Sequence, residues 1–275
     1  MTVARTCFFC GRRGSLSKEH VWPRWIQKYV DTPEPTRSSR TTGFYHEGDT
    51  ITIEPDRITP PRQGSVLTFK VRIVCERCNN GWMSKLESQA KPILRSLISD
   101  EAAVIEAAAA ATLATWAVKT AWMNEHLNSE DSPTTTVSMR AKLMRHLLPP
   151  YSLVWLARHN GLLNLDLRRA GITVLHQDDP QGLQGNRRAQ MTSIVVRPFA
   201  LLVWTVDGWG VPPPRRPAQW APLWPSVEGI NWRALPVVSD EEVLRAVAAH
   251  CPPLRMPAHT QVRRLDLGPE VIEQA

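Results

Sequence analysis

The clearest alternation of apolar and polar residues lies in SVLTFKVRIVC, which ends at Cys75. Its period of two predicts a half-buried strand with Lys70 and Arg72 on the polar side. The next stretch, NNGWMSKLESQAKPILRSLI, has apolar residues at helical spacing, and we expect Pro92 to kink or restart that helix. The pattern therefore predicts a strand that runs directly into a helix.

Upstream of this strand the pattern is weaker. Residues 15–22 can be extended, and Pro23 suits the first turn of a short helix. The stretch DTPEPTRSSRTTG (31–43) predicts a loop, and ITIEPDRI predicts a short strand that Pro60-Pro61 should interrupt. We therefore treat residues 31–64 as a loop inserted into an N-terminal module that spans 1–98.

Downstream, helices come first and strands follow. Alanine-rich sequence predicts a long helix at about 100–126, and a shorter one is expected at about 139–148. SLVWLARH, GITVLH, MTSIVVRP and FALLVWTV predict strands. SDEEVLRAVAAH predicts a final helix, with Ser239 as N-cap and Glu242 completing a capping box. The sequence thus predicts an α+β protein with a helical segment at 99–150 and an α+β C-terminal domain at 151–275.

Composition narrows the function classes. Hydrophobic residues make up 43% of the chain and charged residues 21%, as in ordinary globular proteins. No apolar run reaches the ~20 residues that span a bilayer, and the N-terminus lacks the apolar core of a signal peptide. We expect a cytoplasmic protein without membrane contact.

The charge is uneven along the chain. The net charge is +7, and residues 1–85 hold 14 Lys and Arg against 8 Asp and Glu. A basic excess favours polyanionic partners, because neutralising phosphates releases counterions. Nucleic acid is therefore the first partner to consider, although many globular proteins are mildly basic.

Four of the five cysteines form two Cys-x-x-Cys pairs, Cys7/Cys10 and Cys75/Cys78. Without a secretory signal, two such knuckles predict a tetrahedral structural zinc site rather than disulfides. The 64 residues between the knuckles require an insertion. Cys251 is expected to be an ordinary semi-buried thiol.

KEHVWPRW (18–25) lies between the two knuckles. The motifs therefore follow one another in the order Cys-x-x-Cys, Glu-His-x-x-Pro, strand, Cys-x-x-Cys-Asn and helix. This order resembles the HNH endonuclease superfamily, whose ββα-metal module is often a treble clef braced by four zinc-binding cysteines. VCERCNNGWMSKLE also resembles a group of bacterial HNH-like proteins. The resemblance covers about residues 5–95. The family pattern C-x-x-C…(D/E)-H-x-x-P…C-x-x-C-(N/H) is matched by Cys7, Cys10, Glu19, His20, Pro23, Cys75, Cys78 and Asn79.

The resemblance implies a metal-dependent endonuclease that hydrolyses phosphodiester bonds, with DNA as the expected substrate. His20 would take a proton from water, which an ordinary pKa near ~6.5 permits. Glu19 and Asn79 would hold a catalytic Mg²⁺ or Mn²⁺. The nearby basic residues are candidate phosphate contacts, and they are Lys18, Arg24, Lys70 and Arg72.

One family residue has no counterpart. The middle Asn, which commonly orients the histidine, is missing from TFKVRIVC. A backbone carbonyl could take its place, Asn80 could, or catalysis could be impaired. This departure favours an alternative in which the module binds nucleic acid or another partner without cutting. Hydrolysis of a different phosphate ester is a further alternative, and the C-terminal domain could select substrate, form a homodimer or sense a ligand.

Structural roles compete with these assignments. Glu19 could favour a helix N-terminus through the macrodipole, and Asn79 and Asn80 could be helix caps. Trp22, Trp25 and Trp82 could stack on bases or form a small core. Six further histidines are scattered without ligand spacing, and they are His126, His146, His159, His176, His250 and His259.

Overall fold

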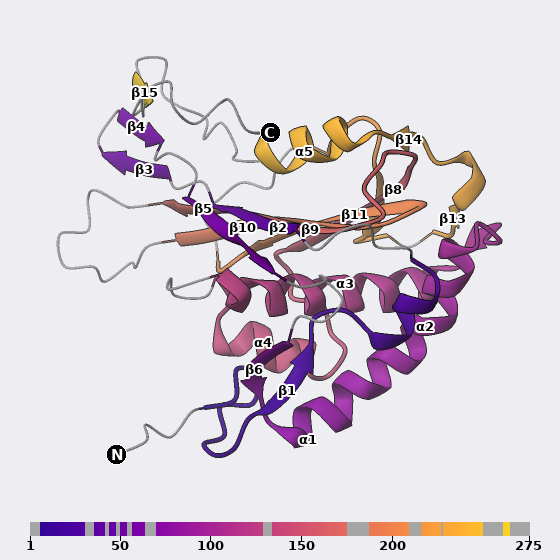
Figure 1. Cartoon of the computed structure of the whole chain (residues 1–275), viewed down its shortest axis with the longest axis horizontal. Helices are drawn as coiled ribbons and strands as arrows, with labels where there is room; N and C mark the ends of the chain where they lie inside the picture. Colours follow the sequence, from indigo (N-terminus) through magenta and orange to yellow (C-terminus); the bar gives the residue numbers. More distant parts are fainter. Residues whose placement is uncertain are drawn as a thin grey trace.

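The computed structural model describes residues 6–30, 36–41, 44–47, 50–53, 57–63, 70–128, 134–174, 187–208, 216–226, 228–249 and 261–264. The fold is mixed α+β, with a cysteine cluster near the N-terminus, a helical middle and a C-terminal sheet (Figure 1). In Figure 1 the sheet lies between α5 on one side and α3 on the other, and the cysteine-bearing segments lie beyond α3.

The N-terminal segments form two antiparallel strands followed by a helix. Strand β1 pairs with β6, with Glu19 opposite Val71 and His20 opposite Lys70. The chain then passes through Cys75 into helical backbone that continues to Ile98. The bounds are β1 (Ser17–His20), η1 (Arg24–Lys28), β6 (Lys70–Val74), α1 (Glu76–Cys78), η3 (Asn79–Met83) and α2 (Ser84–Ile98).

The expected kink at Pro92 is not where the helix departs from regular geometry. Pro92 lies inside α2, which is continuous from Ser84 to Ile98. The irregular residue is Gly81, with φ −93° and ψ −109°, in the wide turn η3 just after Cys78. Such wide turns within helices often occur at functional sites.

The segment expected as an inserted loop contains strands. Strand β2 pairs with β5, and β3 pairs with β4, both antiparallel, while β15 pairs with β4 in parallel. Strand β5 runs through Pro60-Pro61, which a two-stranded ladder tolerates because both strands are edges. The bounds are β2 (Thr36–Thr41), β3 (Phe44–Glu47), β4 (Thr50–Ile53), β5 (Arg57–Gln63) and β15 (Gln261–Arg264).

The helical middle consists of α3 (Ala107–Asn128) and α4 (Val137–Leu143). Helix α3 starts later than the alanine pattern predicts, because β7 (Val104–Ile105) pairs with β13 (Ile230–Asn231). It packs against the sheet on one side and against α2 and β6 on another. Burial on several sides explains why its sequence shows no simple polar stripe.

The C-terminal sheet has the strand order β12-β8-β11-β10-β9, with β14 also paired to β8. The predicted strands SLVWLARH and FALLVWTV are confirmed as β8 and β11, and every residue of β11 is buried. One sheet face packs toward α3 and the other toward α5. The bounds are β8 (Ser152–His159), β9 (Leu165–Val174), β10 (Arg187–Val196), β11 (Phe199–Val206), β12 (Ala221–Trp224), η4 (Trp232–Ala234), β14 (Val237–Val238) and α5 (Asp240–Ala249).

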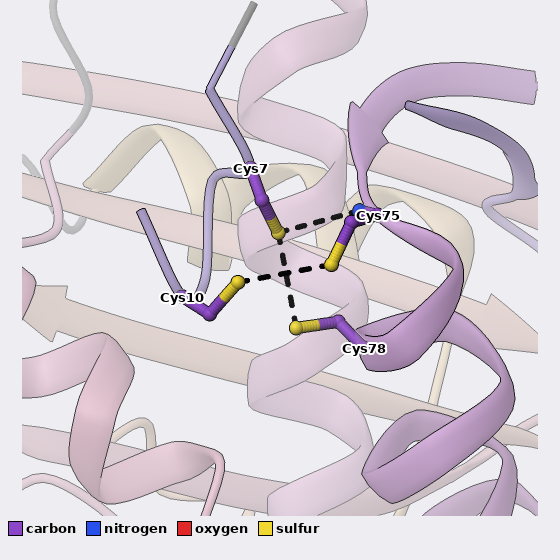
Figure 2. Close-up of side chains that lie close together, drawn as sticks. All are labelled: Cys7, Cys10, Cys75 and Cys78. Atoms are coloured by element: carbon purple, nitrogen blue, oxygen red, sulfur yellow. Dashed lines mark hydrogen bonds between the residues drawn. The ribbon is translucent and has the colours of Figure 1, made fainter. Parts of the chain in front are cut away.

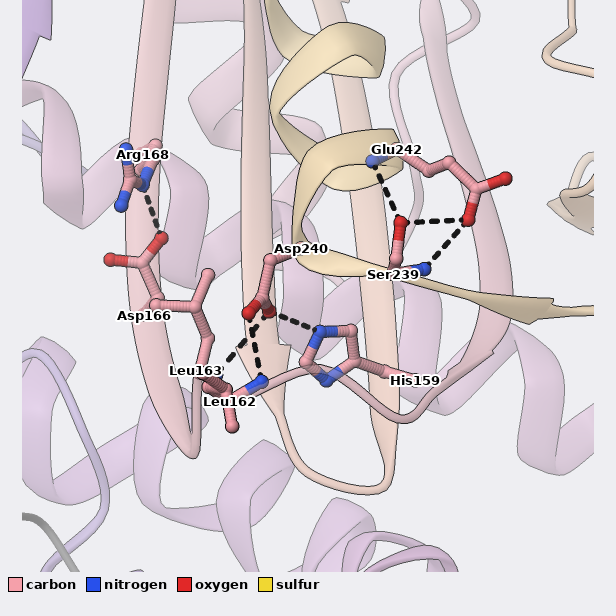
Figure 3. Close-up of polar contacts among 8 residues, drawn as sticks. All are labelled: His159, Leu162, Leu163, Asp166, Arg168, Ser239, Asp240 and Glu242. Carbon is pink, nitrogen blue, oxygen red and sulfur yellow. Dashed lines mark hydrogen bonds and ion pairs between the residues drawn. The ribbon is translucent and has the colours of Figure 1, made fainter.

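Helix α5 is fixed to the sheet by polar contacts at its first turn (Figure 3). The predicted capping box is confirmed, since Ser239 Oγ accepts from the Glu242 N–H and Glu242 Oε2 accepts from the Ser239 N–H. Asp240 accepts from Leu162 N–H and lies 2.8 Å from the buried ring of His159. His159 is therefore a structural residue at the end of β8. Among the described residues, no helix is both long enough and apolar enough to cross a bilayer.

Candidate metal centre and the neighbouring pocket

The two cysteine knuckles meet in space (Figure 2). Their four sulfurs all lie within 4.8 Å of one another, with Cys7 and Cys78 3.8 Å apart and Cys10 and Cys75 3.7 Å apart. Zinc–sulfur bonds of about 2.3 Å directed to the corners of a tetrahedron separate the sulfurs by about 3.8 Å. A disulfide would need an S–S distance of about 2.05 Å. The sulfurs therefore have the spacing of a four-thiolate zinc site.

Backbone turns bring the sulfurs together. Gly11, with φ +69°, closes the first knuckle and donates its N–H to the Cys7 carbonyl. The Phe8 N–H donates to the Ile73 carbonyl, which joins this knuckle to β6. The Cys75 N–H donates to Cys7 Sγ at 3.3 Å, a contact typical of thiolates in zinc knuckles. Strand, turn and helix thus all converge on the four sulfurs.

The four cysteine thiols differ in how readily they ionise. Burial opposes ionisation of Cys7, but N–H groups of Cys10, Cys75 and Phe9 outweigh it and lower the pKa to about 7. Burial and the charge of Cys7 raise the pKa of Cys78 well above its usual value. The two pKa shifts run in opposite directions because the thiols lie close together, and a bound cation would favour the thiolate form of all four. The donor set fits structural zinc.

Glu19 and Asn79 meet beside the knuckles in a pocket of about 240 Å³. We call it the α2 pocket, and it is lined by Glu19, Trp25, Asn79, Asn80, Ser84, Glu87, Ser88 and Lys91. Burial and the neighbouring Glu87 raise the pKa of Glu19, while Lys119 and a hydrogen bond from Asn79 act against this rise. Most of the lining residues carry oxygen atoms, the donors that Mg²⁺ and Mn²⁺ prefer.

His20 is not among the residues that line the α2 pocket. Its Nε2 accepts a hydrogen bond from Arg24 Nε at 3.4 Å, and Lys70 stands opposite it on β6. Burial, Lys70 and Arg24 all lower the pKa of His20. Consecutive side chains of a strand point to opposite faces, so Glu19 faces the helix and His20 faces the cationic side of the strand pair.

The predicted phosphate contacts gather on that same side. Lys18, Arg24, Lys70 and Arg72 are all exposed. The alternation of β6 leaves Lys70 and Arg72 exposed while Val71 is buried, as the sequence pattern predicts. The His20 ring is contacted by Arg24.

The contacts of Asn79 and of the three nearby tryptophans distinguish structural roles from functional ones. Asn79 is the C-cap residue of α1 and is not the N-cap of a helix, and its side-chain amide donates to Ser17 Oγ at 3.2 Å. Trp22 is buried at 1% exposure, and Trp82 packs edge-on against Phe9, so both belong to the small core. Trp25 is half-buried and lies at the pocket with Lys91 near its ring. Cys251, Arg37, Arg40 and Arg215 lie outside the residues whose side chains are described.

Glu87 lines the α2 pocket and Lys119 acts electrostatically on the Glu19 carboxylate, and neither residue was assigned to the site from the sequence. Ser84, Glu87 and Lys91 recur at helical spacing, which places them on one face of α2, and Asn80 precedes them in η3. Lys119 is buried at 2% exposure in α3, and it is the only charged residue between Ala107 and Asn124. That isolated charge in apolar helical sequence is the signal that could have drawn attention to it.

Searches of protein-family models, curated proteins and solved structures found no match to this chain.

Proposed function

We propose that this protein is a zinc-braced, HNH-type endonuclease that hydrolyses phosphodiester bonds in DNA with a divalent cation. One observation carries the proposal. Glu19, at the end of the first strand, and Asn79, directly after the second knuckle, line one pocket beside four clustered cysteines. These are the positions that the sequence motif assigns to the catalytic metal.

Each part has a physical role. Zinc held by the knuckles would fix β1 and the start of the helix relative to each other. Glu19 and the Asn79 amide oxygen would hold Mg²⁺ or Mn²⁺, and a bound ion supplies charge stabilisation at the phosphate and at the leaving oxygen. The pocket's size leaves room for the water molecules that Mg²⁺ usually retains.

His20 would act as general base. Its lowered pKa keeps the ring neutral, and therefore able to accept a proton, at physiological pH. In an in-line displacement the attacking water and the leaving oxygen lie on opposite sides of phosphorus. A strand that presents His20 to one face and Glu19 to the other is compatible with a phosphate placed at the strand end between them.

The exposed basic face would guide the substrate. Arg24 and Lys70 lie beside His20, and Lys18 and Arg72 are exposed on the same two strands, so a phosphate backbone that follows them would pass the proposed base. Such contacts position nucleic acid without reading its sequence.

The decisive experiment is cleavage of supercoiled plasmid by zinc-loaded protein with added Mg²⁺ or Mn²⁺. His20→Ala and Glu19→Gln should each lower the rate by about 10²-fold or more. Glu76→Gln, which changes an exposed glutamate beside the second knuckle, is the matched control and should retain the wild-type rate. No cleavage by wild type in any metal, or equal cleavage by all four proteins, would refute the catalytic proposal.

A second candidate function is zinc-dependent nucleic-acid binding without cleavage. The contact of Arg24 with His20 Nε2 favours it, because this nitrogen would otherwise be free to accept a proton. Binding through the basic face should depend steeply on salt, and a Lys70→Gln/Arg72→Gln variant should reduce the log–log salt slope by about 2. Lys85→Gln, at an exposed lysine on α2, should leave the slope unchanged. Salt-dependent binding without cleavage would support this candidate over the nuclease.

A further inference from the structure

Arg140 on α4 contacts the first zinc knuckle from the helical layer. Its guanidinium lies 4.6 Å from the centre of the Phe8 ring, and Phe8 stands between Cys7 and Cys10. The side chain is half-buried, and its Nε has no hydrogen-bond partner among the described residues. A desolvated guanidinium beside an aromatic face needs an electrostatic reason to remain there.

The zinc site supplies one reason. Four thiolates around Zn²⁺ carry a net charge of −2, and Cys7 and Cys78 are both buried. Burial lowers the pKa of Arg140, whereas the charges of Glu125 and Cys7 favour its cationic form. Arg140 therefore lies within the electrostatic reach of a cysteine ligand, although it does not coordinate the metal itself.

The buried carboxylate of Glu125 is a second negative charge that favours the cationic form of Arg140. Its side chain is 1% exposed on α3, and Oε1 accepts the Thr134 N–H at 2.8 Å. Arg169 of β9 lies 3.8 Å from the same oxygen and also donates to Gln190 of β10 at 2.7 Å. Glu125 is thus linked through Arg169 to the C-terminal sheet, and its charge favours the cationic form of Arg140.

We propose that Arg140, stacked on Phe8 of the first knuckle, is an outer cation of the zinc centre, and that its charge slows the release of zinc from the knuckles. This inference depends on the zinc assignment and is independent of nuclease activity. Outer groups of this kind commonly change metal affinity by 10- to 100-fold. Arg140 would offset the negative charge of the thiolates without taking part in the reaction.

The test is the rate at which purified, zinc-loaded protein transfers zinc to an excess of a colorimetric chelator. Arg140→Met, which keeps much of the side chain's bulk and removes the charge, should speed release about tenfold. Arg140→Lys keeps the charge and should stay within about threefold of wild type. Arg145→Met, at an exposed arginine just beyond α4, is the matched control and should not change the rate.

The controls separate charge from folding. Circular dichroism and the absorption of the Co²⁺-substituted protein show whether each variant folds and keeps four thiolate ligands. If Arg140→Met does not fold, Arg140→Gln and Arg140→Lys provide the comparison between neutral and charged side chains. Release from Arg140→Met within twofold of wild type would overturn the proposal. So would equal release from the neutral and lysine variants, or a wild-type protein that binds no zinc.

Discussion

The strand pair that carries the knuckles and the C-terminal sheet are held together in different ways. Strands β1 and β6 contain four and five residues, and their outer face is exposed and basic. Strands β8 to β11 contain eight to ten residues, and β11 is buried on both faces between α3 and α5. A two-stranded pair is marginal by itself. Here β1 and β6 are supported by the four-cysteine cluster and by a core that includes Trp22, Val71 and Val74, whereas the sheet is supported by apolar burial on both faces.

The two regions also differ in where their polar side chains lie. In the N-terminal region, the polar residues with candidate chemistry face a pocket or solvent. In the sheet, described polar side chains such as Gln190 and Thr205 are buried and contact Arg169 and Trp122. The candidate functional groups therefore lie in the small region, which packs on the large one through α3.

The largest expected effect comes from removing zinc. Cys78→Ser should abolish zinc retention and cost the N-terminal region several kcal/mol of stability, because metal binding supplies folding free energy there. Amide hydrogen exchange should become fast in β1 and β6 and stay slow in β8, β10 and β11. Wild type treated with chelator should give the same pattern. Uniform loss of protection would show instead that both regions unfold as one unit.

A substitution that shortens a buried side chain in β11 tests the C-terminal sheet. Leu201 is fully buried in the central strand β11, so Leu201→Ala should lower the free energy of unfolding by about 3 kcal/mol. Zinc content should not change, because the substitution lies in the sheet. Leu162→Ala, at a leucine that is 88% exposed, is the control and should cost less than about 0.5 kcal/mol. Denaturant titration with parallel metal analysis measures both quantities, and zinc loss in Leu201→Ala would contradict the separation.

A smaller effect is expected at the junction of α5 and the sheet. Burial acts to raise the pKa of Asp240, but donors from Leu162, His159 and Leu163 outweigh it and lower the pKa. Asp240→Asn should cost about 1–2 kcal/mol at neutral pH, because hydrogen bonds to a charged acceptor are lost.

The sign of the pH dependence follows from the lowered pKa. The folded protein favours the carboxylate, so its stabilising contribution is complete above the unfolded pKa of about 3.9 and is lost as pH falls through the lower folded value. The difference in unfolding free energy between wild type and Asp240→Asn should therefore be constant from pH 7 to about 5 and shrink below about 4. A difference that grows in acid would assign the stabilisation to another group.

The features that could be predicted from the sequence are those set by residues close together in the chain. The cysteine pairs, the capping box at Ser239 and the strands β8 and β11 all follow from spacing within a few residues. These features can be predicted without knowing distant partners, because a turn, a helix cap or a fully apolar strand is determined by its own residues and their immediate neighbours.

Features that depend on distant partners could not be predicted in this way. Strand β4 overlaps the strand predicted in ITIEPDRI, but its pairing with residues 261–264 and the pairing of β2 with β5 could not be predicted. Helix α3 begins late because Val104 and Ile105 pair with residues more than 120 positions away. The α2 pocket combines a strand with one face of a helix, so Glu87 could not be assigned to it from the motif.

The separation of the two knuckles sets the order in which the zinc centre can assemble during synthesis. Cys7 and Cys10 leave the ribosome as half a site, and 64 residues must follow before Cys75 and Cys78 can complete it. At about 5–20 residues per second, the first pair waits roughly 3–13 seconds for the second. During that interval the thiols are exposed to oxidation or to a competing metal. Zinc capture therefore marks the moment at which the intervening segment has been fully translated.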